Sequence, residues 1–174
     1  ALYEFTSLPD SQLLELARGM SEEEKRSVFA AYVGKRGNRR HKPGRGLERV
    51  TYRFDLLTDF GTFRDLQRHR MLTIQWQHLS PHHGYSVPDA VIDAGQESMW
   101  HEAMDRTADL YQQVTDQHGR EVAQYVVPFA YRIRYSLQLS AREAFHMLEL
   151  RTAEGGHPDY RHVCQKMHTL IRDQ

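Results

Sequence analysis

The sequence has little cysteine and no long apolar run, and each absence excludes a class of protein. Cys164 is the only cysteine among 174 residues, so the chain cannot form an internal disulfide or a cysteine-rich zinc site. No apolar run is long enough to cross a membrane, and the first residues lack the pattern of a signal peptide. We therefore expect a soluble cytoplasmic protein.

The sequence also lacks an excess of either charge. Lys+Arg and Asp+Glu both number 23, so overall charge indicates no nucleic-acid, membrane or acidic partner, and any basic function must be local. The chain contains no G-x-S-x-G, P-loop or G-x-G-x-x-G motif. The common hydrolase, NTPase and dinucleotide-binding classes therefore have no support.

The length and the 40% hydrophobic content predict one globular domain over residues 1–174. The first residue is alanine rather than methionine. This leaves open that the sequence is part of a longer, tandem protein.

Capping residues predict where the helices begin and end. Ser7 is a candidate cap for a first helix, and Ser21 with Glu24 forms a capping box for a second that stops at Gly34. Residues 97–118 form an amphipathic helix closed by Gly119. Its expected apolar positions are Met99, Trp100, Ala103, Met104, Ala108, Tyr111 and Val114.

Three shorter helices are expected in the second half. One covers residues 121–127 before Pro128. Another begins after Ser140, with Glu143 completing a capping box, and runs to about Arg151. The last begins at Pro158, with Val163, Met167 and Leu170 facing inward.

Alternating apolar residues predict strands over 48–56, 71–79 and 131–139, with a short helix over 62–70 between the first two. The expected fold is α/β (α+β), a small, mostly antiparallel sheet with helices packed on it, and no internal repeat is visible.

Three clusters are candidate sites. His78, His82 and His83 have a spacing that metals use, but Pro81 disrupts the helix this needs, and we expect no metal site. The basic loop 35–46 could neutralise phosphates, yet it has no aromatic platform, so nucleic-acid binding is the less favoured interpretation. Arg68, His69 and Arg70 are the third cluster, because guanidinium groups grip phosphates and planar carbonyl-rich rings.

The order of these features resembles the flavin-dependent thymidylate synthases. Their signature is RHR, seven residues and a serine, followed far downstream by N-x-R-x-x-x-N/H-F-L-x-L-R, which is similar to SAREAFHMLELR at 140–151. The resemblance runs over almost the whole chain. It implies an α/β domain that assembles as a homotetramer, binds FAD and converts dUMP to dTMP with methylenetetrahydrofolate and NADPH.

The resemblance also implies roles for single residues. Arg68, His69 and Arg70 would contact FAD, as would Thr73 and His146 at related positions, and Arg151 would grip the nucleotide. It assigns no catalytic residue.

Other positions depart from the family pattern. The family's glutamate, signature serine and two arginines are replaced here, which predicts weakened hydrogen bonding to the dUMP base and phosphate. The replaced positions are Arg49, Asp65, Gln75, Trp76, His78, Ser80, Gln124 and Ser140.

Two interpretations therefore stay open. The chain is either a flavin-binding domain that contributes to thymidylate synthesis, or a degenerate module that keeps the fold and an oligomer interface inside a larger synthase.

Overall fold

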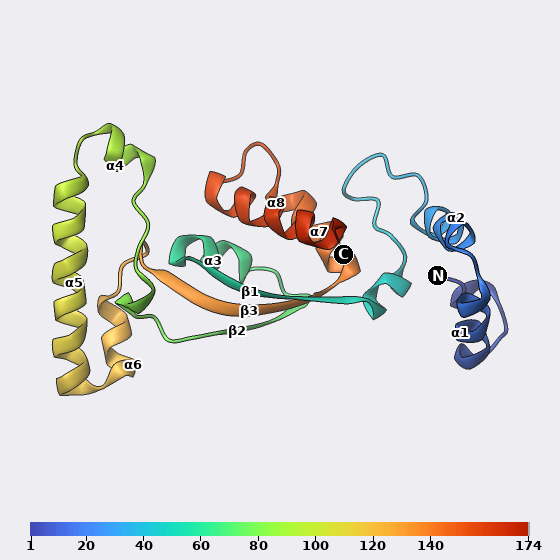
Figure 1. The fold of residues 1–174 in the computed structure, drawn as a ribbon, viewed down its shortest axis with the longest axis horizontal. Helices are drawn as coiled ribbons and strands as arrows, with labels where there is room; N and C mark the ends of the chain where they lie inside the picture. Colours follow the sequence, from blue (N-terminus) through green and yellow to red (C-terminus); the bar gives the residue numbers. More distant parts are fainter. Residues whose placement is uncertain (174) are drawn as a thin grey trace. The chain divides into compact units, whose positions relative to one another are not determined.

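The computed structural model describes residues 1–173 and contains eight α-helices, four 3-10 helices and three strands in this described part (Figure 1). Residues 53–138 form one compact unit, and residues 1–52 with the chain from Leu139 onward form another. The elements are η1 (Tyr3–Phe5), α1 (Asp10–Gly19), α2 (Glu22–Val33), η2 (Arg45–Arg49), β1 (Thr51–Asp59), α3 (Phe60–Leu66), β2 (Leu72–Trp76), η3 (Pro81–His83), α4 (Asp89–Asp93), α5 (Glu97–His118), α6 (Arg120–Ala123), η4 (Gln124–Val126), β3 (Arg132–Ser140), α7 (Ala141–Arg151) and α8 (Pro158–Arg172).

The three strands form one antiparallel sheet in the order β1-β3-β2, so the last strand in sequence lies between the first two. The ends of the β1–β3 pair are fixed by Ala141 N–H donating to the Val50 carbonyl (2.8 Å) and Phe60 N–H donating to the Tyr131 carbonyl (3.0 Å). The predicted fold class, a small antiparallel sheet accompanied by helices, is confirmed.

One face of the sheet is buried and the other is polar, as the alternation predicts. Ile133, Tyr135 and Leu137 of β3 are buried. In the unit of residues 53–138, Phe63 of α3 covers this face, with its ring centroid 5.0 Å from that of Tyr135. On the open face Arg134 pairs with Asp55, at 2.7 Å between Nη2 and Oδ2.

Helix α5 has the predicted bounds and ends at Gly119, whose φ of 84° suits glycine. It packs through a narrower stripe than predicted. Met104 and Tyr111 are buried, whereas Met99 is 65% exposed. Met99 lies about 140° around the helix from Met104, on the side facing water. Ala103 is exposed as well.

The same unit has its own helical core around Tyr131. The Tyr131 hydroxyl donates to the Met104 carbonyl at 2.6 Å, and burial raises the pKa of this tyrosine. The buried members of this core are Met104, Tyr111, Ala123, Val127 and Tyr131.

The other unit confirms three of its four predicted helix starts. Ser21 and Glu24 form the capping box of α2, Ser140 caps α7 by accepting from Glu143 N–H, and Pro158 begins α8. The prediction that Ser7 caps the first helix is wrong. Pro9 is the N-cap, and its backbone is extended (ψ 157°), so the helix begins at Asp10.

Helix α8 faces inward through Cys164 and Met167, which are fully buried. The Cys164 thiol therefore packs in the interior of this unit. Leu170, predicted to face inward, is exposed because the last turn of α8 is largely uncovered. Among the described residues no helix is long and apolar enough to span a bilayer.

Candidate functional site

The arginine-histidine-arginine segment lies in the turn between α3 and β2. Helix α3 is capped by Asp59, whose carboxylate accepts from both the backbone N–H and the hydroxyl of Thr62, each at 2.8 Å. Phe63 and Leu66 are buried beneath it. The turn then closes by His69 N–H donating to the Leu66 carbonyl at 3.2 Å.

The helix predicted over 62–70 therefore ends early, at Leu66, and Arg68 to Arg70 lie outside it. Once Leu66 has been buried, no further apolar residue in the turn could keep the helix against the sheet. Arg68 to Arg70 therefore lie in a turn whose backbone is held by α3 at one end and by β2 at the other.

The side chains of this turn differ in their exposure to solvent. His69 is buried, at 8% exposed, whereas Arg68 and Arg70 on either side of it are exposed. Arg68 Nε lies 4.0 Å from the Asp65 carboxylate, a loose contact across one helical turn. The turn therefore offers two guanidinium groups that a diphosphate could engage.

Strand β2 follows this turn and carries the next predicted residue. Thr73 is exposed on β2. Trp76, at the end of the strand, is 55% exposed and contacts Phe63 with ring centroids 5.5 Å apart. The indole is thus partly used in packing against α3, where an acidic side chain would have no such partner.

Several of the positions predicted to depart from the family pattern have structural contacts. Gln124 Oε1 accepts from Leu79 N–H at 2.9 Å, which ties the segment after β2 to η4. Ser80 beside it is buried. In the other unit, Arg49 donates two hydrogen bonds to Asp10, of 2.8 and 2.9 Å.

Two of the three histidines considered for a metal have contacts with other side chains. His82 lies edge-on to Tyr111, with centroids 6.0 Å apart, and His83 Nε2 is 3.1 Å from Gln77 Oε1. His78 is exposed.

Helix α7 carries the remaining predicted residues. His146 is exposed, and Arg151 at the end of the helix is half-buried. The Arg151 guanidinium lies 5.2 Å from the centre of the Tyr160 ring on the same unit, which holds it as a cation–π pair.

The basic loop 35–46 is joined to the same unit's helices by ion pairs that the sequence did not reveal. Arg36 pairs with Glu149 of α7, and Glu48 pairs with both Arg45 and Arg142. The arginines, Arg45 foremost, hold the pKa of Glu48 below its usual range. Two of the loop's cations are therefore neutralised within the protein.

The open face of the sheet has a shallow polar groove of about 280 Å³ in the unit of residues 53–138. Its polar side chains come from all three strands and from the residue that follows β2: Arg53, Asp55, Gln75, Gln77, Arg134 and Ser136. Sequence reasoning missed it, because strand order decides which exposed positions become neighbours.

Residues 4–174 match the family model described as thymidylate synthase complementing protein. The chain belongs to this family. The resemblance found in the RHR and SAREAFHMLELR motifs is thereby confirmed over almost the whole chain.

Curated relatives of the chain are longer than it is. A UPF0159 protein of Chlamydia pneumoniae is 40% identical over 163 residues, covering 94% of this chain and 30% of the relative. A UPF0159 protein of Thermoplasma acidophilum is 34% identical over 165 residues, covering 93% of this chain and 33% of the relative. The chain therefore spans about a third of the length of the relatives it matches.

Solved structures share the fold of this family member. The UMP/dUMP methylase PolB from Streptomyces cacaoi, bound with 5-Br dUMP, matches with a TM-score of 0.71 at 20% identity, covering 88% of this chain and 76% of that one. A second structure of PolB, bound with 5-Br UMP, has a TM-score of 0.63 and covers 75% of this chain and 72% of that one. At this identity the match establishes the fold.

Proposed function

We propose that the chain is a flavin-dependent thymidylate synthase-like domain that binds FAD and is impaired in binding dUMP by itself. The observation that carries this proposal is the RHR turn, in which a buried His69 separates the exposed Arg68 and Arg70. We assign Arg68, His69, Arg70, Thr73 and His146 to the cofactor, and Arg151 to the nucleotide.

The donor set of the turn fits FAD. Arg68 and Arg70 present planar guanidinium groups that pair with diphosphate oxygens, and the fixed turn reduces the ordering cost of binding. When bound, the flavin supplies the redox chemistry of the family's reaction, the reductive methylation of dUMP with methylenetetrahydrofolate and NADPH. The protein's part is to hold and orient the cofactor.

The proposed nucleotide site has lost a positive charge relative to the family pattern. Gln124 stands at a position where the family has a phosphate-binding arginine, and its amide oxygen is already used by Leu79. Each charge-assisted hydrogen bond lost costs roughly 1.5–3 kcal/mol of recognition. We propose that a complete nucleotide site needs further polypeptide, either in a homo-oligomer such as the family's tetramer or in the remainder of a longer protein.

A second candidate is a module that has lost the chemistry and keeps the fold inside a larger synthase. The contacts of Gln124 with Leu79, Arg49 with Asp10 and Trp76 with Phe63 favour it, because the replaced positions now stabilise the chain. This candidate predicts an intact RHR-x7-S copy elsewhere in the same polypeptide or complex.

An absorbance titration separates the two candidates. Purified protein is mixed with FAD, washed and scanned for retained flavin bands. The first candidate predicts that flavin is retained. It also predicts that Arg68→Ala and Arg70→Ala each lower the affinity for FAD about tenfold or more, because each variant loses a charge-assisted contact. Arg106→Ala on α5, whose exposed arginine pairs with Glu102, is the matched control.

The outcomes of this titration are distinct. Absence of flavin bands at every FAD concentration contradicts the first candidate and supports the module. If flavin is retained, calorimetry with dUMP tests the impaired nucleotide site, and we expect weak binding that Gln124→Arg strengthens. Binding of dUMP at full strength by the unaltered chain would contradict the impairment.

A further inference from the structure

The basic loop that follows α2 has an ordered backbone. His41 N–H donates to the Asn38 carbonyl at 3.1 Å, which closes a β-turn. Arg39 and Arg40 occupy the two central positions of this turn, and Arg40 N–H also donates to Asn38 Oδ1 at 2.9 Å. An asparagine side chain that accepts from the backbone two residues later stabilises such a turn. The two arginines therefore lie at the tip of a defined structure.

Contacts with the rest of the unit hold this loop on both sides of the turn. Arg36 Nε donates to the His41 carbonyl, and the same guanidinium pairs with Glu149 of α7. Arg142 Nε donates to the Pro43 carbonyl at 3.0 Å, and Pro43 is buried. The loop is consequently preorganised, so little further ordering is needed when its exposed side chains meet a partner.

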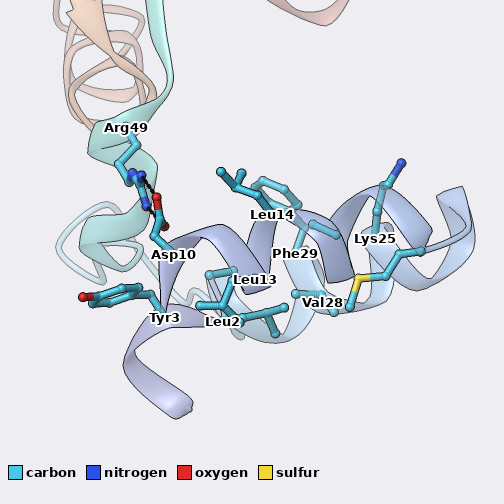
Figure 2. Close-up of a pocket in the computed structure, with 12 residues that line it drawn as sticks. Leu2, Tyr3, Asp10, Leu13, Leu14, Lys25, Val28, Phe29 and Arg49 are labelled. Carbon is cyan, nitrogen blue, oxygen red and sulfur yellow. Dashed lines mark hydrogen bonds and ion pairs between the residues drawn. The ribbon is translucent and has the colours of Figure 1, made fainter. Parts of the chain in front are cut away.

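The cations in and beside the loop fall into two groups. Arg36 and Arg45 pair with carboxylates, and Figure 2 shows Arg49, just after the loop, paired with Asp10. The remaining cations of the loop are exposed and have no ion-pair partner in the part of the chain that the structure describes. They are Lys35, Arg39, Arg40 and Lys42. Since the loop itself contains no acidic residue, it presents these four charges uncompensated.

The chemistry of these four groups favours a row of phosphates as the ligand. Guanidinium and ammonium groups bind phosphate oxygens through charge-assisted hydrogen bonds, and four cations along one loop can each meet a different phosphate. The loop contains no Phe, Tyr or Trp, the platforms on which sites for single strands stack unpaired bases. A duplex, in contrast, presents regularly spaced phosphates while its bases stay stacked.

We propose that the basic loop binds the phosphate backbone of double-stranded nucleic acid through its four unpaired cations. Contacts of this kind position a protein on a duplex without reading its sequence, so the affinity depends on salt and not on base sequence. The proposal is independent of FAD and dUMP binding, because none of the four cations is assigned to the cofactor or to the nucleotide.

Fluorescence anisotropy of a short labelled duplex tests the loop. Between about 50 and 200 mM salt, the logarithm of the binding constant should fall against the logarithm of the salt concentration with a slope of about −3.6, as four neutralised phosphates predict. Arg39→Gln with Arg40→Gln should reduce the slope to about −1.8 and weaken binding at the lowest salt at least about tenfold. Lys35→Gln with Lys42→Gln should have the same effect.

The matched control removes two charges elsewhere in the same unit. Arg18 of α1 and Arg26 of α2 are exposed arginines without an ion-pair partner among the described residues. The double variant Arg18→Gln with Arg26→Gln should keep both the slope and the affinity of the unaltered chain. Absence of binding at about 50 mM salt, or equal slopes in the loop variants and the control, would overturn the proposal.

A variant that leaves the charge unchanged tests the ordered turn. Asn38→Ala removes the acceptor of Arg40 N–H, so the turn must be ordered again when the duplex binds. We expect the affinity to fall about threefold or more while the salt slope stays the same. An unaltered affinity would show that the turn does not present the arginines to the duplex.

Competition identifies the ligand. Unlabelled duplex should displace the labelled one, a single strand of equal length should displace it less well, and inorganic pyrophosphate should act only at millimolar concentration. Displacement by the single strand as effective as that by the duplex would overturn the choice of a duplex. Displacement by micromolar pyrophosphate would overturn the proposal in favour of a compact phosphate site.

Discussion

Arg36 and Glu149 are joined by two hydrogen bonds although they lie 113 residues apart in sequence. The distances are 2.6 Å from Nη1 to Oε1 and 2.8 Å from Nη2 to Oε2. The Arg36 guanidinium also lies 5.0 Å from the centre of the Phe145 ring. One arginine therefore anchors the basic loop 35–46 to α7 within their unit.

Removing this anchor should free the loop. Glu149→Ala is expected to cost about 1–2 kcal/mol of unfolding free energy, because it leaves a half-buried guanidinium without its carboxylate. Trypsin should then cut faster after Arg39 and Arg40. Urea unfolding and timed digestion measure both effects, with Glu154→Ala, an exposed position, as the control. Equal cleavage in both variants would show that the ion pair does not hold the loop.

Gly44 should tolerate no side chain, because the Tyr32 ring occupies the space. A Cβ on Gly44 would overlap the Tyr32 Cζ and hydroxyl oxygen, whereas one on Gly19 meets nothing within 4 Å. We expect Gly44→Ala to destabilise the protein by about 1–3 kcal/mol and Gly19→Ala to leave it unchanged or slightly stabilised. Thermal unfolding of the two variants checks this, and similar melting temperatures would contradict it.

Gln124 should hold the segment that follows β2. Gln124→Ala leaves Leu79 N–H without its acceptor, at an expected cost of about 1–2 kcal/mol. Hydrogen exchange at Leu79 should accelerate, while exchange in α5 stays slow. Glu121→Ala, one turn earlier and exposed, serves as the control. Unaltered exchange at Leu79 would remove the structural role argued for this position.

Cys164 should make stability depend on alkaline pH. Burial raises the pKa of its thiol from 9.0 to about 11, so the folded state keeps the proton longer than the unfolded state does. The stabilisation that this pKa difference gives to the folded state is fully present below pH 9 and is lost as the pH rises toward 11. It amounts to about 3 kcal/mol, and urea unfolding measures it as the change with pH in the difference in unfolding free energy between the unaltered chain and Cys164→Ala.

The thiol should also react slowly in the folded protein. A disulfide reagent at pH 8 is expected to label Cys164 only as the chain unfolds, so labelling should accelerate with urea. Rapid labelling without denaturant would contradict the buried, protonated thiol.

Local signals in the sequence determined most helix ends and the family. Ser21, Gly34, Ser140 and Pro158 act on backbone groups within about four residues, so their effects can be predicted without knowing the fold. The alternation of apolar residues in β1 and β3 needs only a period of two. The RHR and SAREAFHMLELR motifs likewise depend on residue order alone.

Tertiary structure alone decided which distant groups meet. The order β1-β3-β2, the bond from Leu79 to Gln124, and the choice of Glu149 as partner for Arg36 join positions 45 or more residues apart. A charged or amide side chain can pair with many others, and its own position in the sequence does not say which one. The choice depends on how the whole chain can bury its apolar faces at once, because the free energy of that burial outweighs any single polar contact.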